Sequence, residues 1–272
     1  MGLRFTGERV IPELPEMRVT FVQSCAAYEY AARSVAGKRV LDIGAGEGYG
    51  PALLAKHAAL TVGLDRDPEA VRWAATKYGA VDRLAFVAGA AEAVPLRSGS
   101  VDVVTCFQVI EHLHDPLAYL REVARALTAD GTLFLTTPNR LKVGARPNPH
   151  HVHDFAPAEL AGVLRDVFAE VDIYGVFAGP AVAAYRERND RVVRGLLRLD
   201  LLGILGRLPE RLLQPAHVML TLMIRRTVNA RSGALLTDLT TADFPIRAEP
   251  IDEAIDLLAV CRTPAPPSAA RR

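Results

Sequence analysis

The feature that most constrains this chain is a glycine-rich turn after an apolar stretch, Val40 to Gly50, which reads VLDIGAGEGYG. Glycines occupy every second position from Gly44 to Gly48, so the backbone can adopt conformations closed to other residues and approach a ligand closely. At a strand-to-helix turn, such glycines also aim the free N–H groups of the next helix at that ligand. The turn therefore predicts an α/β fold with a nucleotide-like ligand.

The turn does not match the dinucleotide fingerprint GxGxxG. Counted from Gly44 the sixth residue is Tyr49, and counted from Gly46 it is Pro51. What remains is the pattern Asp-x-Gly-x-Gly-x-Gly from Asp42, with a second acidic residue, Asp65, at the end of the next apolar stretch. A nicotinamide-dependent dehydrogenase is therefore a distant alternative.

Short β-branched runs bounded by Gly or Pro alternate with helix-permissive segments from Lys38 to Phe177. This alternation is typical of βαβ units, so we expect a doubly wound, mostly parallel α/β sheet with helices between its first six strands. Seven strands are predicted, at Arg39–Gly44, Thr61–Asp65, Leu84–Gly89, Val101–Phe107, Thr132–Pro138, Glu170–Phe177 and Asp256–Arg262.

The long segment between the sixth and seventh strands lacks the βαβ rhythm. Apolar residues recur near helical spacing between Arg186 and Arg226, so we expect a helical insert at about 178–235. Its basic amphipathic character would suit a membrane surface or an acidic partner, but packing on the core or on a second subunit is the simpler interpretation. The predicted organisation is an N-terminal cap at 1–37, one domain at 38–262 and an unstructured tail at 263–272.

The amino-acid composition limits the partners that we expect for this protein. The 272 residues carry 32 Lys and Arg against 31 Asp and Glu, without the basic excess of proteins that grip phosphate backbones, so no nucleic acid is expected. We find neither a signal-peptide stretch nor a run of roughly 18 apolar residues, and so expect no integral membrane segment. Cys25, Cys106 and Cys261 lack metal-ligand spacing and are expected to be reduced thiols of a cytoplasmic protein.

Four segments in a fixed order resemble the class I S-adenosylmethionine-dependent methyltransferases, in particular those of type 11. The segments are the glycine turn followed by Asp65, LAFVAGAAEAVPL from Leu84, SVDVVTCFQVIEHLHDP from Ser100, and GTLFLTTPNR, which contains Pro138 and Asn139. The resemblance implies a Rossmann-like methyltransferase sheet and S-adenosylmethionine as the cofactor.

The resemblance also implies which residues bind the cofactor. The glycine turn accommodates methionine and ribose in this family, and the Asp65 carboxylate suits two ribose hydroxyls because it only accepts hydrogen bonds. Where the family usually carries an Asp for the adenine amino group, this chain has Ala90, which leaves the backbone at Ala90 and Ala91 as candidates. The predicted cofactor-binding residues are Asp42, Gly44, Ala45, Gly46, Gly48, Asp65, Arg66, Ala90, Ala91, Phe107 and Gln108.

Methyl transfer from a sulfonium is an in-line displacement, so the enzyme chiefly aligns the acceptor and excludes water. A hydroxyl acceptor gains from a base that titrates near neutrality, and imidazole is the usual choice. Sugar methyltransferases of related design place a catalytic histidine in the loop after the fourth strand, although a histidine there could also only cap or pack. The predicted catalytic residues are His112, ahead of His114, and His151; the predicted substrate-binding residues are Glu111, Asn139, Arg140, His150 and His153.

A second group, His150, His151, His153 and Asp154, follows a loop with two prolines. It could supply substrate contacts, a base or metal ligands. Magnesium prefers oxygen ligands and the spacing is not a recognised zinc arrangement, so we predict no metal and a loop that covers the pocket. Four arginines could hold an anionic or sugar acceptor, or could be plain surface charges: Arg9, Arg33, Arg140 and Arg146.

A narrower resemblance concerns the acceptor. Phe5 to Arg9 with Tyr28 and Tyr30, NPHHVHDF from Asn148, and TTADF from Thr240 resemble a bacterial subgroup linked with sugar and polysaccharide methylation, which includes a mycobacterial methylglucose lipopolysaccharide methyltransferase. It implies methyl transfer to a hydroxyl of a sugar or glycoconjugate, in polysaccharide biosynthesis. The alternatives are methylation of a small aromatic or quinone-like metabolite and a non-catalytic S-adenosylmethionine-binding protein. The expected partners are a small-molecule or glycan acceptor and a second copy in a homodimer.

Overall fold

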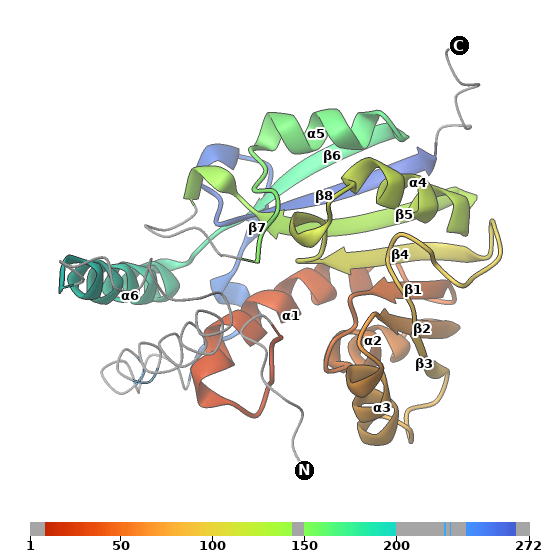
Figure 1. Cartoon of the computed structure of the whole chain (residues 1–272), viewed down its shortest axis with the longest axis horizontal. Helices are drawn as coiled ribbons and strands as arrows, with labels where there is room; N and C mark the ends of the chain where they lie inside the picture. The colour runs from red at the N-terminus through yellow and green to blue at the C-terminus, as the bar shows by residue number, and fades with distance from the viewer. Residues whose placement is uncertain (1–8, 143–149, 200–225, 227–228, 230–237, 265–272) are drawn as a thin grey trace.

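The computed structural model describes residues 9–142, 150–199, 226, 229 and 238–264, and eight strands lie within them. In chain order these are β1 Arg39–Ile43, β2 Leu60–Asp65, β3 Leu84–Ala88, β4 Val101–Phe107, β5 Leu127–Pro138, β6 Phe168–Val176, β7 Ile246–Arg247 and β8 Asp256–Pro264. They form one sheet in the order β3-β2-β1-β4-β5-β8-β6-β7 (Figure 1). The pairs among β1 to β5 are parallel, whereas β8 runs antiparallel to both β5 and β6. The mostly parallel sheet expected from the sequence is confirmed.

Two details of the predicted fold are wrong, one about the strands and one about a helix. The sheet has an eighth strand, because Ile246 and Arg247 pair with Val176 and Gly175; a two-residue strand is too short to show alternation in the sequence. Among the described residues, the connection between β3 and β4 contains turns instead of the expected helix. That connection carries Gly89, Pro95 and Gly99, which are residues that interrupt helices.

Helices occupy the other connections of the parallel part. The α-helices are α1 Arg18–Ala32, α2 Tyr49–Ala55, α3 Pro68–Lys77, α4 Pro116–Ala126, α5 Pro157–Arg165 and α6 Pro180–Leu199; the short 3₁₀ helices are η1 Pro15–Met17, η2 Ile110–His112, η3 Arg140–Lys142, η5 Thr241–Asp243 and η6 Ile251–Glu253. Proline at the first position and a capping aspartate explain two of the starts. Asp67 accepts a hydrogen bond from the Glu69 N–H at 2.8 Å and Asp115 accepts one from the Ala118 N–H at 2.9 Å.

The sheet is buried on both faces. Successive strand residues alternate between two apolar clusters, so Leu133 and Leu135 lie in one and Phe134 in the other. The first cluster includes Leu120 of α4 and Leu160 of α5, and the second includes side chains of α1 and α2. The arrangement fixes the carboxyl ends of β1, β2 and β4 along one edge of the sheet (Figure 1).

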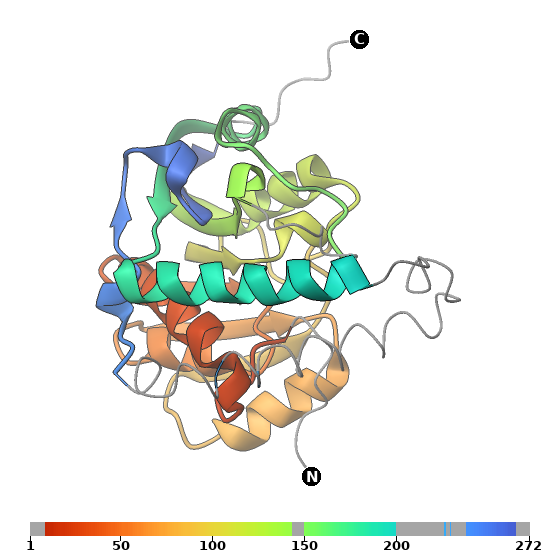
Figure 2. The ribbon, with the colours of Figure 1, turned by 90° about the vertical axis from the view of Figure 1, so that its left-hand side faces the viewer.

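The helix α6 follows β6 and extends at the edge where the parallel strands end, and it crosses the face seen in Figure 2. It packs on α1 through Tyr185 and Val19. Most of the insert predicted at 178–235 lies outside the described residues, as does the tail from residue 265, so the domain boundaries stay predictions. No helix in the described ranges is both long and apolar enough to span a bilayer.

Candidate active site

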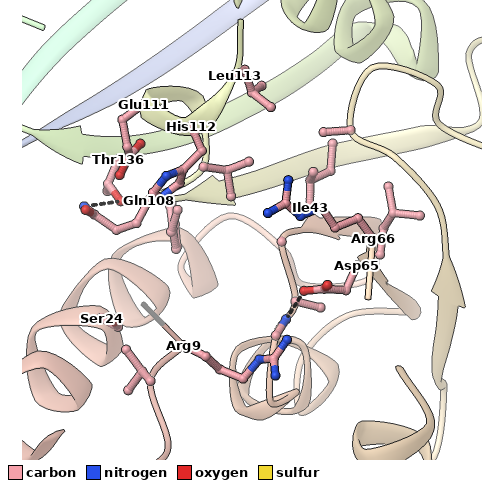
Figure 3. Close-up of a pocket in the computed structure, with 18 of the residues that line it drawn as sticks. Arg9, Ser24, Ile43, Asp65, Arg66, Gln108, Glu111, His112, Leu113 and Thr136 are labelled. Atoms are coloured by element: carbon pink, nitrogen blue, oxygen red, sulfur yellow. Dashed lines mark hydrogen bonds between the residues drawn. The ribbon is translucent and has the colours of Figure 1, made fainter. Parts of the chain in front are cut away.

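A pocket of about 520 Å³ opens at the carboxyl ends of β1, β2 and β4. This position is where open α/β sheets bind ligands. Of the predicted residues, the pocket is lined by Gly44, Ala45, Gly46, Asp65, Arg66, Ala90, Ala91, Phe107, Gln108, Glu111, His112, His114 and His151. In Figure 3, Asp65 and Arg66 lie toward one end of the pocket, and Glu111 and His112 lie toward the other.

The glycine turn is held in an unusual backbone conformation. Gly44 has a φ of 79° and Gly46 a φ of 52°, values that a side chain disfavours. A Cβ atom on Gly44 would also lie 2.4 Å from Cγ2 of Val109, inside the distance of any real contact. Both the conformation and the packing therefore require glycine at position 44.

Asp65 ends β2 beside this turn. Its Oδ2 atom accepts a hydrogen bond from the Gly46 N–H at 2.7 Å (Figure 3). Its Oδ1 atom accepts one from the Asp67 N–H at 2.9 Å. Asp67 is in turn bound by the Arg9 guanidinium at 2.8 Å. These bonds fix a carboxylate that lines the pocket, and each of its oxygens has further lone pairs for a ligand's hydroxyl groups.

Asp42 lies beneath the turn rather than in the pocket lining. Its carboxylate is fully buried and accepts hydrogen bonds from the Tyr28 hydroxyl at 3.1 Å and from the Thr105 hydroxyl at 2.5 Å. Burial raises the pKa of Asp42 to about 7, although the two hydroxyls oppose this rise. The geometry makes Asp42 a support for the turn, and its predicted contact with the cofactor stays a prediction.

The other end of the pocket holds two histidines and a glutamate. The His112 Nδ1–H donates to the carbonyl oxygen of His150 at 3.0 Å, and His151 Nδ1 bonds the Asp154 carboxylate at 2.8 Å. The centroids of the two imidazole rings are 5.1 Å apart, and the ring planes are nearly perpendicular. These two bonds engage Nδ1 of each ring and so fix the orientation of both imidazoles in the pocket wall.

Glu111 completes this group from a buried position. The Thr137 hydroxyl donates to its Oε2 atom at 3.1 Å. The backbone carbonyl oxygen of Glu111 accepts hydrogen bonds from the N–H groups of Val152 at 2.8 Å and His153 at 3.1 Å. These bonds hold the segment that contains His151 against the loop after β4. One ligand atom from each of Glu111, His112 and His151 lies within 4.8 Å of the others.

Asp256, the first residue of β8, lines the same pocket, although it was not predicted from the sequence. Its Oδ2 atom accepts hydrogen bonds from the amides of Gln23 at 2.5 Å and Gln108 at 3.2 Å. Burial raises the pKa of Asp256 to about 6. No local pattern marks this residue, since it reaches the pocket only because β8 inserts between β5 and β6.

Several predicted residues lie elsewhere. Asn139 is buried and its amide donates to the carbonyls of Ile251 and Ala254, which joins two loops. Arg140 is exposed and pairs with Glu159 at 2.8 Å, and His153 is exposed beside the Phe155 ring. Gly48 and His150 are absent from the pocket lining, and His114 lies on its exposed rim. Of the four candidate arginines, Arg9 lines the pocket, Arg33 is exposed and Arg146 lies outside the described residues.

The amino-acid sequence of this chain is similar to those of known proteins. A family described as a methyltransferase domain matches residues 41–135. A probable S-adenosylmethionine-dependent methyltransferase of Mycobacterium tuberculosis is 32% identical over 271 residues, covering 96% of this chain and 90% of that protein. A ubiquinone biosynthesis O-methyltransferase of Xanthomonas oryzae is 34% identical over 172 residues, covering 56% of this chain and 72% of that protein.

A solved structure of a possible histamine N-methyltransferase from Thermotoga maritima superposes with a TM-score of 0.56 at 14% identity, covering 90% of this chain and 93% of that one. At this identity the likeness shows the fold alone. Fold and sequence together define a methyltransferase with a Rossmann-like sheet. The chain belongs to the S-adenosylmethionine-dependent methyltransferase family, and S-adenosylmethionine is its cofactor.

The pocket fits this cofactor. Its volume lies within the roughly 300–1,000 Å³ usual for small-molecule sites. The glycine turn offers close backbone approach, and the fixed Asp65 carboxylate offers acceptors for neighbouring hydroxyls. A polar end that contains two imidazoles adjoins this cofactor end in one cavity.

Proposed function

We propose that the protein transfers a methyl group from S-adenosylmethionine to a hydroxyl oxygen of a sugar or glycoconjugate. The observation that carries the proposal is the polar end of the pocket, where His112, His151, Gln108 and Asp256 adjoin the glycine turn in one cavity. Such a wall can hold several hydroxyl groups through donors and acceptors together. It suits a polyhydroxylated acceptor better than a flat apolar ring.

On the cofactor side, the turn from Gly44 to Gly46 is proposed to hold the methionine and ribose, and Asp65 to accept hydrogen bonds from the ribose hydroxyls. The backbone at Ala90 and Ala91, which line the pocket, is proposed to contact the adenine. Arg66, Phe107 and Gln108 also line the pocket and complete the proposed contacts.

S-adenosylmethionine supplies an electrophilic methyl group on a sulfonium. The acceptor oxygen forms a bond to that carbon while the carbon–sulfur bond breaks with its electron pair on sulfur, and the hydroxyl proton must leave. The chain contributes alignment and activation. We propose that the hydroxyl is activated at Glu111, His112 and His151, where hydrogen bonds at Nδ1 orient both imidazoles.

A second candidate is methylation of a quinone-like or aromatic metabolite, which the partial likeness to the Xanthomonas enzyme favours. The aromatic residues of the pocket, Tyr28, Tyr49 and Phe107, stack edge to face on one another. The same lining contains the polar side chains of Gln108, His112, His151 and Asp256, and these support the sugar acceptor.

Calorimetric titration with S-adenosylmethionine, with NADH as the control ligand, tests the cofactor side. We expect micromolar binding of the former alone, and binding of neither ligand would contradict the proposed cofactor contacts. Release of S-adenosylhomocysteine then separates an enzyme from a non-catalytic binder. His112→Ala should lower turnover by about 100-fold or more while cofactor affinity is kept, and full turnover in this variant would refute activation at His112.

A further inference from the structure

We infer that Glu111, His112 and His151 form a binding site for one divalent transition-metal ion at the acceptor end of the pocket. The role that we give the ion in the reaction rests on the proposed function. The existence of the site does not, because it follows from the arrangement of the three side chains.

The ligand atoms converge. One atom from each residue lies within 4.8 Å of the others, and ligands held about 2.0–2.2 Å from one ion lie at most about 4 Å apart. A bound ion would close this difference through small rotations of the two imidazoles. Glu111 is fully buried and the two histidines are partly buried, so the three groups form a site on the pocket wall rather than a cluster of surface charges.

Each ligand is also oriented by a second group, as metal ligands in proteins usually are. The His150 carbonyl holds Nδ1 of His112, and the Asp154 carboxylate holds Nδ1 of His151, so each ring has a fixed orientation. The Thr137 hydroxyl holds the carboxylate of Glu111. General-base catalysis would require only one such imidazole. Two oriented imidazoles and one carboxylate are instead the ligands typical of a metal site.

The ligand types select the ion. Two imidazole nitrogens and one carboxylate suit Mn²⁺, Fe²⁺, Co²⁺ or Zn²⁺, whereas Mg²⁺ prefers oxygen ligands and retains its water. A metal ion at this site differs from our expectation from the sequence, which was that no metal binds. Spacing within the segment from His150 to Asp154 could not reveal the site, because two of the ligands lie about forty residues earlier and the Val152 and His153 N–H groups bring the segments together.

Three protein ligands leave coordination positions open toward the pocket, as in catalytic metal sites. A hydroxyl oxygen of the acceptor would occupy one position and lose its proton more readily there. The proton would pass to the Asp256 carboxylate, whose hydrogen-bond partners Gln23 and Gln108 are uncharged amides. The oxygen would then form its bond to the methyl carbon as the carbon–sulfur bond breaks, and His112 and His151 would act as ligands throughout.

Calorimetric titration of chelator-treated, dialysed protein with Mn²⁺ or Zn²⁺ alone tests the site without cofactor or acceptor. We expect one ion per chain, binding at least tenfold weaker in His151→Ala and in Glu111→Gln, and unchanged binding in the control His57→Ala, which removes an exposed imidazole. Mg²⁺ should bind at least a hundredfold more weakly than Mn²⁺. Circular dichroism and melting curves identify any variant that fails to fold.

Stoichiometric binding that is lost in the two ligand variants but kept in the control supports the site. Absence of binding to the unaltered protein, or equal binding by all variants, would overturn it. Because S-adenosylmethionine binding is measured separately, failure of the metal site is distinguishable from failure of the methyltransferase proposal. If the chelated protein methylated its acceptor at the full rate, the role of the ion in the reaction would be refuted.

Discussion

The side-chain amide of Gln108 donates a hydrogen bond to the carboxylate of Asp256 at 3.2 Å, and this bond joins the loop after β4 to the first residue of β8. Gln108 adopts a φ of 57°, which residues other than glycine seldom do. Strained backbone of this kind tends to occur at ligand sites. The Gln108 amide also donates to the Thr136 hydroxyl at 3.3 Å (Figure 3). The parallel strand β4 and the antiparallel strand β8, which lie on either side of β5, thus both contribute to the acceptor side of the pocket.

Replacement of Asp256 tests the acceptor side. In Asp256→Asn the side chain keeps its shape but loses its charge, so we expect kcat/KM for the acceptor to fall by about tenfold or more, while the Kd for S-adenosylmethionine stays within about threefold. Asp252→Asn, at an exposed aspartate of η6, is the matched control and should behave like the unaltered protein. Unchanged turnover in Asp256→Asn would exclude Asp256 from the reaction.

Replacement of Asp65 tests the cofactor side. Asp65→Ala removes the acceptors for the ribose hydroxyls and for the Gly46 N–H, so the Kd for S-adenosylmethionine should rise by about 10- to 100-fold. Asp82→Ala, at an exposed aspartate outside the pocket lining, should leave the Kd unchanged. Calorimetry measures both, and equal affinities of the two variants would show that Asp65 does not bind the cofactor.

The buried Asp42 should make stability depend on pH. Because burial raises the pKa of Asp42 to about 7 from 3.8, the folded protein holds a proton that the unfolded chain releases between these values. The contribution of this group to stability therefore falls as pH rises, by up to about 1.4 kcal/mol per pH unit, and levels off above pH 7.

Asp42→Asn cannot lose a proton, so the free energy of unfolding of the variant relative to the unaltered protein should increase between pH 5 and pH 8. Urea unfolding at the two pH values measures this difference, and other titrating groups cancel because both proteins have them. A difference that stays constant with pH would contradict the raised pKa.

The glycine turn offers a paired test of conformation. Gly44→Ala places a methyl group against Val109 at a positive φ and should lower the free energy of unfolding by about 1–3 kcal/mol and weaken cofactor binding. Gly162→Ala, in α5 with open space around it, should instead raise stability by up to about 1 kcal/mol. Thermal unfolding compares the two, and equal effects would show that the turn is not constrained.

The sequence could predict those site residues that lie beside a strand with a visible apolar pattern. The glycine turn, Asp65 and His112 each lie at or after the carboxyl end of a strand whose apolar pattern is visible. Their meeting at one edge therefore follows from parallel pairing. Asp256 could not be placed in this way, because β8 runs antiparallel and enters the sheet from a distant part of the chain.

For other predicted residues, side-chain packing determines whether they line the pocket. Asn139 follows β5 at the expected edge, but its amide turns to the carbonyls of Ile251 and Ala254. Asp42 lies in the predicted turn motif, yet the hydroxyls of Tyr28 and Thr105 hold it below the pocket. Such choices depend on neighbours that are distant in sequence, so a motif alone cannot make them.

The acceptor is tested most directly by incubating the protein with S-adenosylmethionine that carries a deuterated methyl group and a mixture of simple hexosides, short oligosaccharides and a catechol. Mass spectrometry then locates the label. The proposal predicts a labelled methyl group on a sugar oxygen, formed in step with S-adenosylhomocysteine. Label on the catechol alone would contradict the sugar acceptor and establish the aromatic alternative.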